Sequence, residues 1–158
     1  MSSKVRIMGI LNVTPDSFYD GGKYNSLDSA LFRAEEMLRD GADIIDVGGE
    51  STRPGSDEVS EDDELARVLP VVEKIVSELG AFVSIDTMKS KIADEAIAAG
   101  ARMINDVSGY EYSYDMPAVA AKHNAALVIM HMKGKPKTMQ DNPVYVNLIE
   151  DICAFLSR

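Results

Sequence analysis

The chain has 158 residues, of which 46% are hydrophobic and 27% are charged, as is typical of one globular domain with a sizeable core. Its formal net charge of −10 excludes nonspecific electrostatic binding to nucleic acid or to an anionic membrane, because binding of either kind needs a basic face on the protein. A single cysteine, Cys153, excludes an internal disulfide, and in the absence of a leader or a membrane-spanning apolar run we expect a cytoplasmic protein.

Five short apolar runs divide the chain, and an amphipathic stretch follows each of them. The runs cover residues 5–13, 43–47, 82–86, 103–107 and 127–132. They are nearly continuous, which is typical of strands that are buried on both faces of a parallel sheet. The alternation of strand and helix predicts parallel pairing with right-handed crossovers, either in an open doubly wound sheet or in a barrel.

The helices are predicted from apolar stripes and from the residues that begin and end them. The stripes cover residues 27–38, 65–79, 90–99, 115–123 and 144–158. Gly41, Gly80 and Gly100 follow the first three stripes, where a C-terminal cap belongs. Ser60 precedes Asp63 by three residues, close to the spacing of a capping box, so the second helix should begin there.

A polar residue stands at or beside the C-terminal end of every predicted strand. In chain order these residues are Asn12, Asp46 with Glu50, Asp86, Asn105 with Asp106, and His131. In a (β/α)8 barrel the active site is built at that end from several strands, so the pattern favours a barrel. We favour a site role for Asp86 and Asn105, and we interpret Asp46 as a carboxylate that binds backbone amides of the following loop. For His131, a structural role and a role in the site both remain open.

Two long loops, residues 12–22 and 48–55, are rich in glycine, proline and hydroxyl groups. One interpretation is that they are flexible connectors. The other is a phosphate site, because Arg53 offers a guanidinium fork and Thr52 beside it offers a hydroxyl donor. The glycines would let the backbone approach an anion closely.

The motifs in these loops and strand ends resemble, in order, those of the dihydropteroate synthase family. They are Ile10-Leu-Asn-Val-Thr-Pro-Asp-Ser-Phe with Asp20-Gly-Gly, Glu50-Ser-Thr-Arg-Pro-Gly, Ser84-Ile-Asp-Thr, Ile104-Asn-Asp-Val-Ser-Gly, and Met130-His-Met. The resemblance spans the whole chain, and the first two motifs are highly specific. It implies a transferase of folate synthesis that joins 6-hydroxymethyl-7,8-dihydropterin diphosphate to p-aminobenzoate. The products would be 7,8-dihydropteroate and pyrophosphate, and the enzyme would be a target of sulfonamides.

The resemblance implies a (β/α)8 barrel of the TIM type, which typically needs about 250 residues. We therefore expect a single domain over residues 1–158 that holds the first five βα units and is truncated in the fifth helix. Its first and last strands should expose unpaired edges and apolar surface. The later motifs of the family are absent, so the chain alone is expected to be inactive. It would be a fragment, one piece of a split barrel or a half-barrel that dimerises, and full-length members of the family are typically homodimers.

The resemblance also implies a set of substrate-binding residues. Asp86 and Asn105 would bind the hydrogen-bonding edge of the pterin, and Met130 would line the pterin pocket. Phe18 and Pro54 would hold the p-aminobenzoate ring between them.

The catalytic residues implied by the resemblance lie in the two long loops. Asp20, Thr52 and Arg53 would close over the diphosphate, and Asn12 would help to hold a magnesium ion bound to it. Arg53 and the ion would stabilise the charge on the leaving pyrophosphate, as preorganised opposite charge does in many active sites.

Other classes of protein stay open as alternatives. A pterin-binding methyltransferase module that takes methyltetrahydrofolate would use a similar barrel, but it has no need of a diphosphate loop. A non-catalytic pterin-binding subunit would keep Asp86 and Asn105 and lack turnover. A metal-dependent hydrolase is disfavoured, because His123 and His131 are the only two histidines in the sequence and do not form the clustered spacing of such sites.

Overall fold

The structure is a computed structural model, and it describes residues 5–14, 26–51, 59–134, 138–139 and 142–157. Its centre is a sheet of five parallel strands whose spatial order, β1-β2-β3-β4-β5, is the order of the sequence. The strands are β1 (Met8–Asn12), β2 (Ile44–Gly48), β3 (Val83–Asp86), β4 (Met103–Asp106) and β5 (Ala126–Ile129). An order that never reverses distinguishes the barrel arrangement from a doubly wound sheet, in which it reverses.

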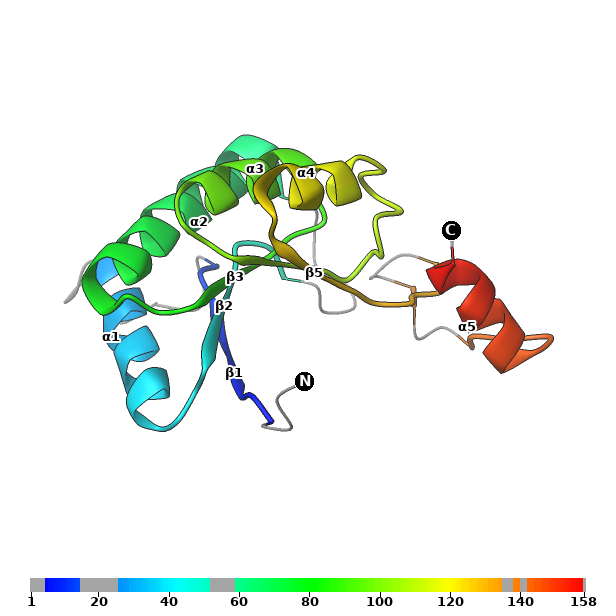
Figure 1. The fold of residues 1–158 in the computed structure, drawn as a ribbon, viewed down its shortest axis with the longest axis horizontal. Coiled ribbons are helices and arrows are strands. Elements are labelled where there is room, and N and C mark those ends of the chain that lie inside the picture. The colour runs from blue at the N-terminus through cyan, green and yellow to red at the C-terminus, as the bar shows by residue number, and fades with distance from the viewer. Residues whose placement is uncertain (1–4, 15–25, 52–58, 135–137, 140–141, 158) are drawn as a thin grey trace.

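All helices except the last cover one face of this curved sheet (Figure 1). The helices are α1 (Ser26–Arg39), α2 (Glu61–Lys74), the π-helical turn η1 (Ile75–Leu79), α3 (Ser90–Ala98), α4 (Met116–His123) and α5 (Leu148–Leu156). Figure 1 shows α1 to α4 along the convex side of the sheet, and α5 projecting beyond the end of β5. The chain thus forms five successive βα units of a TIM-type barrel, as predicted.

The main core lies between the sheet and the helices on its convex side. Because successive residues of a strand point to opposite faces, every second strand residue enters this layer. Leu11, Ile45, Val47, Ile85 and Ile104 are all at most 2% exposed there. The intervening residues face the concave side, where the site described below is built.

The ends of the helices follow the predictions. Ser60 is the N-cap of α2, and its hydroxyl oxygen accepts a hydrogen bond from the Asp63 amide at 3.1 Å. Gly41, Gly80 and Gly100 have φ values of 106°, 60° and 111°. A residue with a Cβ is strained in that region, so the three glycines end their helices by conformation.

Most predicted elements differ from the structure by about one residue at an end, and four differ more. The fifth strand covers Ala126–Ile129 rather than residues 127–132. The first strand covers residues 8–12 rather than 5–13. Residues 75–79 form a π-helical turn that continues α2, so the second stripe is not one α-helix. The last helix begins at Leu148 rather than at residue 144, because the Asn147 side chain caps it by accepting a hydrogen bond from the Glu150 amide at 3.3 Å.

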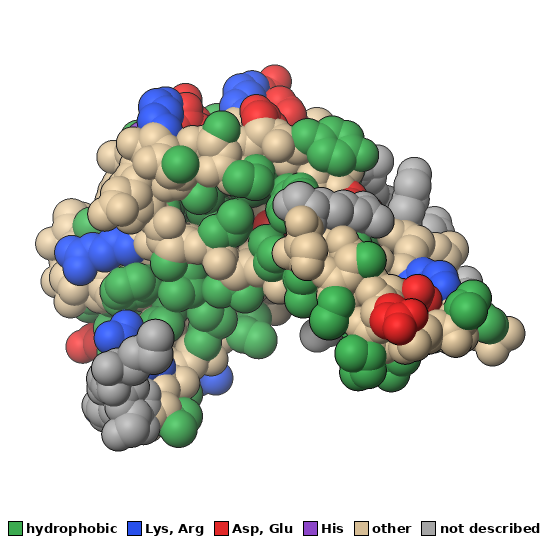
Figure 2. Space-filling model, turned by 45° about the vertical axis from the view of Figure 1, so that its right-hand side comes forward, with side chains coloured by type: hydrophobic (Ala, Val, Ile, Leu, Met, Phe, Trp, Pro, Cys, Tyr) green, Lys and Arg blue, Asp and Glu red, His purple; other side chains and the backbone are tan. Residues whose placement is uncertain are grey.

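The concave face of the sheet carries exposed apolar side chains at both ends of the strand order. Ile10 on β1 is 62% exposed and Val128 on β5 is 41% exposed. Figure 2 shows hydrophobic side chains gathered in the hollow on the concave side of the molecule. In the described ranges, β1 pairs with β2 alone and β5 with β4 alone. The predicted exposed edges are therefore confirmed, whereas burial on both faces holds for β2 and not for the outer strands.

Candidate functional site

The C-terminal ends of the strands bring three of the predicted site residues into one row. The register aligns Asn12 with Gly48, Gly48 with Asp86, and Asp86 with Asn105, so all four face the concave side. A Cβ on Gly48 would lie 3.3 Å from Asp86 Oδ2 and 3.7 Å from Asn12 Oδ1. The glycine therefore leaves open the space onto which the Asp86 carboxylate and the Asn12 amide converge.

Beside this row lie three buried oxygen atoms that have no hydrogen-bond partner among the described residues. They are Asp46 Oδ1, Ser84 Oγ and Asp86 Oδ1. Asp46 and Ser84 are neighbours in the register. Each lies two residues before Gly48 or Asp86 on the same strand, and so on the same face of the sheet. Leaving a buried acceptor unsatisfied costs about 1–3 kcal/mol, so a cluster of three indicates a site for a ligand that brings N–H or O–H donors.

The Asp86 carboxyl group has a strongly altered acidity. Its burial, followed by the negative charges of Asp46, Glu64, Asp106 and Glu50, raises the pKa of Asp86 from 3.8 to about 7. A ligand that donates hydrogen bonds to the carboxylate would favour the charged form and lower this pKa again. A carboxyl group held in this state, on the open face of a sheet, is a strong indication of a binding site.

Asp46 does not have the role that the sequence suggested. Instead of binding amides of the following loop, it is 2% exposed on the concave side, and Asp46 Oδ2 accepts a hydrogen bond from Asn105 Nδ2 at 2.9 Å. The loop role belongs to Asp106, which points to the opposite face from Asn105. Its carboxylate accepts hydrogen bonds from the Ser108 amide at 2.8 Å and the Tyr110 amide at 2.7 Å.

Two predicted residues follow β5. Met130 is 37% exposed, two positions beyond Val128, and continues the concave alternation of that strand. His131 points the other way and packs its ring edge-on against Phe155, with the ring centroids 4.9 Å apart, and near Tyr145 at 5.7 Å. These contacts favour the structural interpretation of His131.

Five predicted residues of the two long loops lie outside the described residues. They are Phe18, Asp20, Thr52, Arg53 and Pro54. Their assigned roles in ring binding and in diphosphate binding stay predictions.

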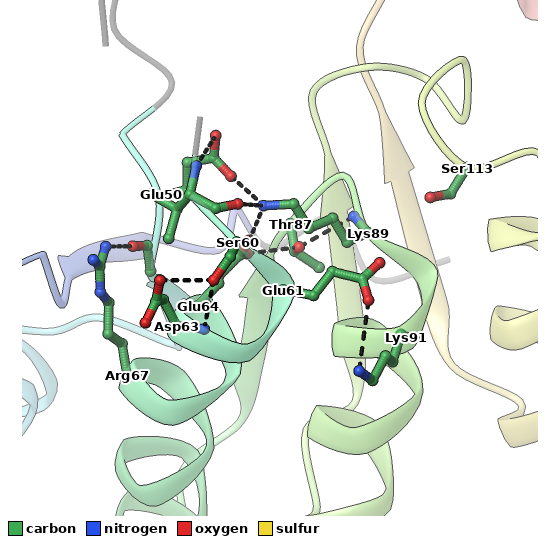
Figure 3. A network of polar contacts seen from close by, with 12 residues as sticks. Glu50, Ser60, Glu61, Asp63, Glu64, Arg67, Thr87, Lys89, Lys91 and Ser113 are labelled. Atoms are coloured by element: carbon green, nitrogen blue, oxygen red, sulfur yellow. Dashed lines mark hydrogen bonds and ion pairs between the residues drawn. The ribbon is translucent and has the colours of Figure 1, made fainter. Parts of the chain in front are cut away.

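A buried ion network that was not predicted from the sequence lies beside the site, as Figure 3 shows. Lys89 Nζ donates hydrogen bonds to Glu50 Oε2 at 2.5 Å and to Glu64 Oε2 at 2.6 Å, and Thr87 Oγ1 donates to Glu64 Oε1 at 2.7 Å. Burial opposes the charge on Lys89, but the bonds to both carboxylates outweigh it and raise the pKa of this lysine above its usual value. The signal in the sequence was Glu64, which lies one helical turn before Val68 on the apolar stripe of α2.

Replacing Gly49 by alanine should destabilise the protein, whereas the same change at Gly48 should not. A Cβ at Gly49 would lie 2.7 Å from Val68 Cγ1 and 3.0 Å from Glu64 Cγ, while the nearest atom at Gly48 is 3.3 Å away. We expect Gly49→Ala to lower the free energy of unfolding by about 1–3 kcal/mol, and Gly48→Ala to change it by less than about 1 kcal/mol. Urea denaturation checks both. Equal losses would mean that α2 does not pack this closely on the end of β2.

A parallel sheet in sequence order, with its polar site at the C-terminal ends of the strands, defines a chain of the TIM-barrel type. The family model described as pterin binding enzyme matches residues 8–158, so the chain belongs to the pterin binding enzyme family. A dihydropteroate synthase from Bacillus subtilis is 60% identical over 128 residues, which are 81% of this chain and 45% of that protein. A dihydropteroate synthase from Clostridium beijerinckii is 51% identical over 152 residues, which are 96% of this chain and 54% of that protein.

Solved structures of dihydropteroate synthases have the same fold. One from Clostridium difficile, in the presence of pteroic acid, has a TM-score of 0.88 at 47% identity. The match covers 98% of this chain and 57% of the Clostridium difficile chain. One from Yersinia pestis, with a sulfonamide drug complex, has a TM-score of 0.87 at 48% identity. The match covers 98% of this chain and 56% of the Yersinia pestis chain. The chain spans about half the length of the curated relatives that it matches.

Proposed function

We propose that these residues form the pterin-binding half of a dihydropteroate synthase. The enzyme would join 6-hydroxymethyl-7,8-dihydropterin diphosphate to p-aminobenzoate, with 7,8-dihydropteroate and pyrophosphate as products. The observation that carries the proposal is the cluster of three buried oxygen atoms, at Asp46, Ser84 and Asp86, that have no hydrogen-bond partner in the described part of the chain. In a chain of the pterin binding family, the N–H edge of a pterin is the donor set that such a cluster lacks.

The chemistry of the pterin edge matches the side chains on the concave face. The amino-pyrimidinone edge presents adjacent N–H donors, and a carboxylate such as Asp86 accepts such a pair with both oxygens. Asn105, whose amide both donates and accepts, would read the neighbouring ring edge. Met130, on the same face, would cover the ring with a polarisable apolar side chain.

The diphosphate would lie at the Asn12 end of this row. Asn12 offers one amide oxygen, and the described part of the chain places no group of three or more His, Cys, Asp or Glu side chains where they could hold a metal ion. This donor set fits a magnesium ion that keeps several waters and takes most of its ligands from phosphate. When bound, the ion would neutralise part of the charge on the diphosphate.

We assign leaving-group stabilisation to Arg53, with Thr52 and Asp20 beside it on the diphosphate. As the bond between the pterin methylene carbon and the diphosphate oxygen breaks, negative charge grows on the pyrophosphate and the guanidinium stabilises it. The pterin ring system delocalises the positive charge left on the methylene. The amine of p-aminobenzoate, held between Phe18 and Pro54, then attacks this carbon and loses a proton, so no side chain has to act as a nucleophile.

This half-site would work as part of a larger protein. Residues 1–158 would belong to one pterin-binding domain, and the activity would belong to a complete barrel that contains them. The complete protein would be a homodimer, as the resemblance implies, and would be cytoplasmic, as its single cysteine led us to expect. Among the described residues, no helix has the length and apolar character needed to cross a membrane.

Incubating the complete protein with both substrates and Mg²⁺ tests the proposal. Chromatography with mass detection should find dihydropteroate and pyrophosphate in equal amounts, and a sulfonamide should compete with p-aminobenzoate. Omitting either substrate is the control. Pterin binding without product would point instead to a non-catalytic pterin-binding subunit. Transfer of a methyl group from methyltetrahydrofolate would point to the methyltransferase class, and either result would overturn the proposal.

A further inference from the structure

Lys89 is a buried lysine that the proposed chemistry does not use. It lies between the end of β3 and the start of α3, and its side chain is 3% exposed. Its ammonium group makes three bonds: to Glu50 Oε2 at 2.5 Å, to Glu64 Oε2 at 2.6 Å and to the Val59 carbonyl oxygen at 2.7 Å. All three hydrogens of the ammonium are thereby used.

Two of these bonds go to the two ends of one segment. Glu50 comes two residues after β2 and Val59 comes two residues before α2, so residues 51–58 lie between them. Glu50 and Val59 also contact each other, because the Val59 amide donates to Glu50 Oε1 at 3.4 Å. Figure 3 shows Lys89 pointing from the α3 side toward Glu50, across the start of α2. Lys89 therefore ties together both ends of the segment that contains Thr52 and Arg53.

The third bond joins these ends to the pterin side of the site. Glu64 accepts from Lys89 and also from Thr87 Oγ1 at 2.7 Å, and Thr87 directly follows Asp86. One chain of contacts thus runs from the strand end that carries Asp86, through Glu64 and Lys89, to Glu50. A buried ion pair is weak evidence of a contribution to stability, because an apolar pair of similar volume often stabilises a fold equally well. A role in fixing geometry is the better explanation for this network.

We propose that Lys89 is a positioning residue that fixes both ends of the 51–58 segment against the end of β3, and so sets the distance between the diphosphate-binding and pterin-binding parts of the site. This inference rests on the proposed function. It assigns to Lys89 no contact with substrate. Because a misplacement of about 1 Å in an active site can cost on the order of 100-fold in rate, a small shift of these ends should be visible in kinetics.

The test compares two double variants of the complete protein. Glu64→Met/Lys89→Met removes the buried pair without changing the net charge and leaves Glu50 and Val59 without their common donor. Glu61→Met/Lys91→Met is the matched control, because Glu61 and Lys91 join the same two helices on the surface, 3.5 Å apart and about half exposed. The variants receive identical side-chain changes.

In Glu64→Met/Lys89→Met we expect kcat/KM for p-aminobenzoate to fall by on the order of 100-fold, with a higher KM. At pH 8, where Asp86 is ionised with or without Glu64, the Kd of 6-hydroxymethylpterin, which lacks the diphosphate, should change less than about threefold. A purely structural role would reduce the active fraction and lower kcat without raising KM. Kinetic constants within about twofold of the wild type in the folded variant would overturn the proposal.

Two further measurements keep the result decisive. If the double variant does not fold, Glu50→Gln weakens the bond to the segment end and leaves Lys89 paired with Glu64. It should change KM for p-aminobenzoate in the same direction, and no change would overturn the proposal.

If the wild type itself shows no turnover, the proposed function fails, but amide hydrogen exchange still tests Lys89. Exchange at Val59 should be faster in Glu64→Met/Lys89→Met than in the control, and equal exchange would overturn the proposal.

Discussion

An Asp86→Asn variant is expected to lose pterin binding and yet to be more stable than the wild type above pH 7. The amide keeps the shape of the side chain but presents one acceptor instead of two, and its NH2 group faces the N–H edge of the pterin. A buried, mismatched donor pair of this kind should weaken pterin binding by at least about 100-fold. Product formation should fall at least as much.

The gain in stability follows from the raised pKa of Asp86. Its folded-state pKa of about 7 lies above the ordinary value of 3.8, so the folded protein holds a proton that the unfolded chain has lost between these values. The free energy of unfolding therefore falls as pH rises through this window, and the loss is complete above pH 7. Asparagine carries no charge, so it removes this loss, which is on the order of 4 kcal/mol for a pKa shift from 3.8 to about 7.

Asp94→Asn is the matched control for this prediction. Asp94 lies on α3, and its pKa is lowered by hydrogen bonds from Lys122, at 2.8 Å, and from His123, at 2.5 Å. Removing this carboxylate should decrease stability at pH 8 and leave pterin affinity unchanged. Thermal unfolding at pH 5 and pH 8, with calorimetry of pterin binding, checks both variants. A destabilised Asp86→Asn protein at pH 8 would contradict the assigned environment of Asp86.

The same titration should appear in pterin binding by the wild type. The ionised carboxylate is the form that accepts two N–H donors, so binding should weaken by about tenfold for each pH unit below 7. The Asp86→Asn variant should bind weakly at every pH. An affinity in the wild type that is constant between pH 5 and pH 8 would exclude Asp86 as the acceptor.

An Arg53→Ala variant is expected to lose turnover while it keeps its affinity for the pterin ring. In the proposed mechanism Arg53 stabilises charge that develops on the leaving pyrophosphate, and removal of one such group typically lowers kcat by about 100- to 1,000-fold. Arg53→Lys keeps the charge but not the bidentate fork, so its kcat should lie between those of the wild type and the alanine variant.

Arg39→Ala provides the comparison for Arg53→Ala. Arg39 ends α1 and is a surface residue 3.6 Å from Glu36, with a side chain that is 65% exposed, so its removal should leave kcat unchanged. Rapid-quench measurement of pyrophosphate release distinguishes a slower chemical step from slower product release. Unchanged turnover in Arg53→Ala would exclude this arginine from leaving-group stabilisation.

Much of the fold could be predicted because local signals agree with the final packing. The capping serine of α2 and the glycines that end three helices act through backbone geometry, which nearby residues determine. The row formed by Asn12, Asp86 and Asn105 was predictable as well, since parallel strands bring their C-terminal ends to one edge of the sheet.

Other features depend on contacts between distant segments, which one sequence does not contain. Asp46 meets Asn105 across 59 positions, and Lys89 meets Glu50 across 39. Hydropathy alone places a lysine at the surface, so its burial between two carboxylates was not predicted. Glu64 on an apolar stripe was the available clue, since a buried carboxylate requires a partner.

A crystal structure of the complete protein with a bound pterin would decide the main claim, that the concave strand ends bind a pterin through Asp86. We predict that both oxygens of the Asp86 carboxylate accept hydrogen bonds from the amino-pyrimidinone edge, with Asn105 beside the ring and Met130 against its face. Asp46 Oδ1 and Ser84 Oγ, which have no partner within the described ranges, should gain a donor from the ligand or from an ordered water. A pterin bound elsewhere, or in this pocket without contact to Asp86, would contradict the claim.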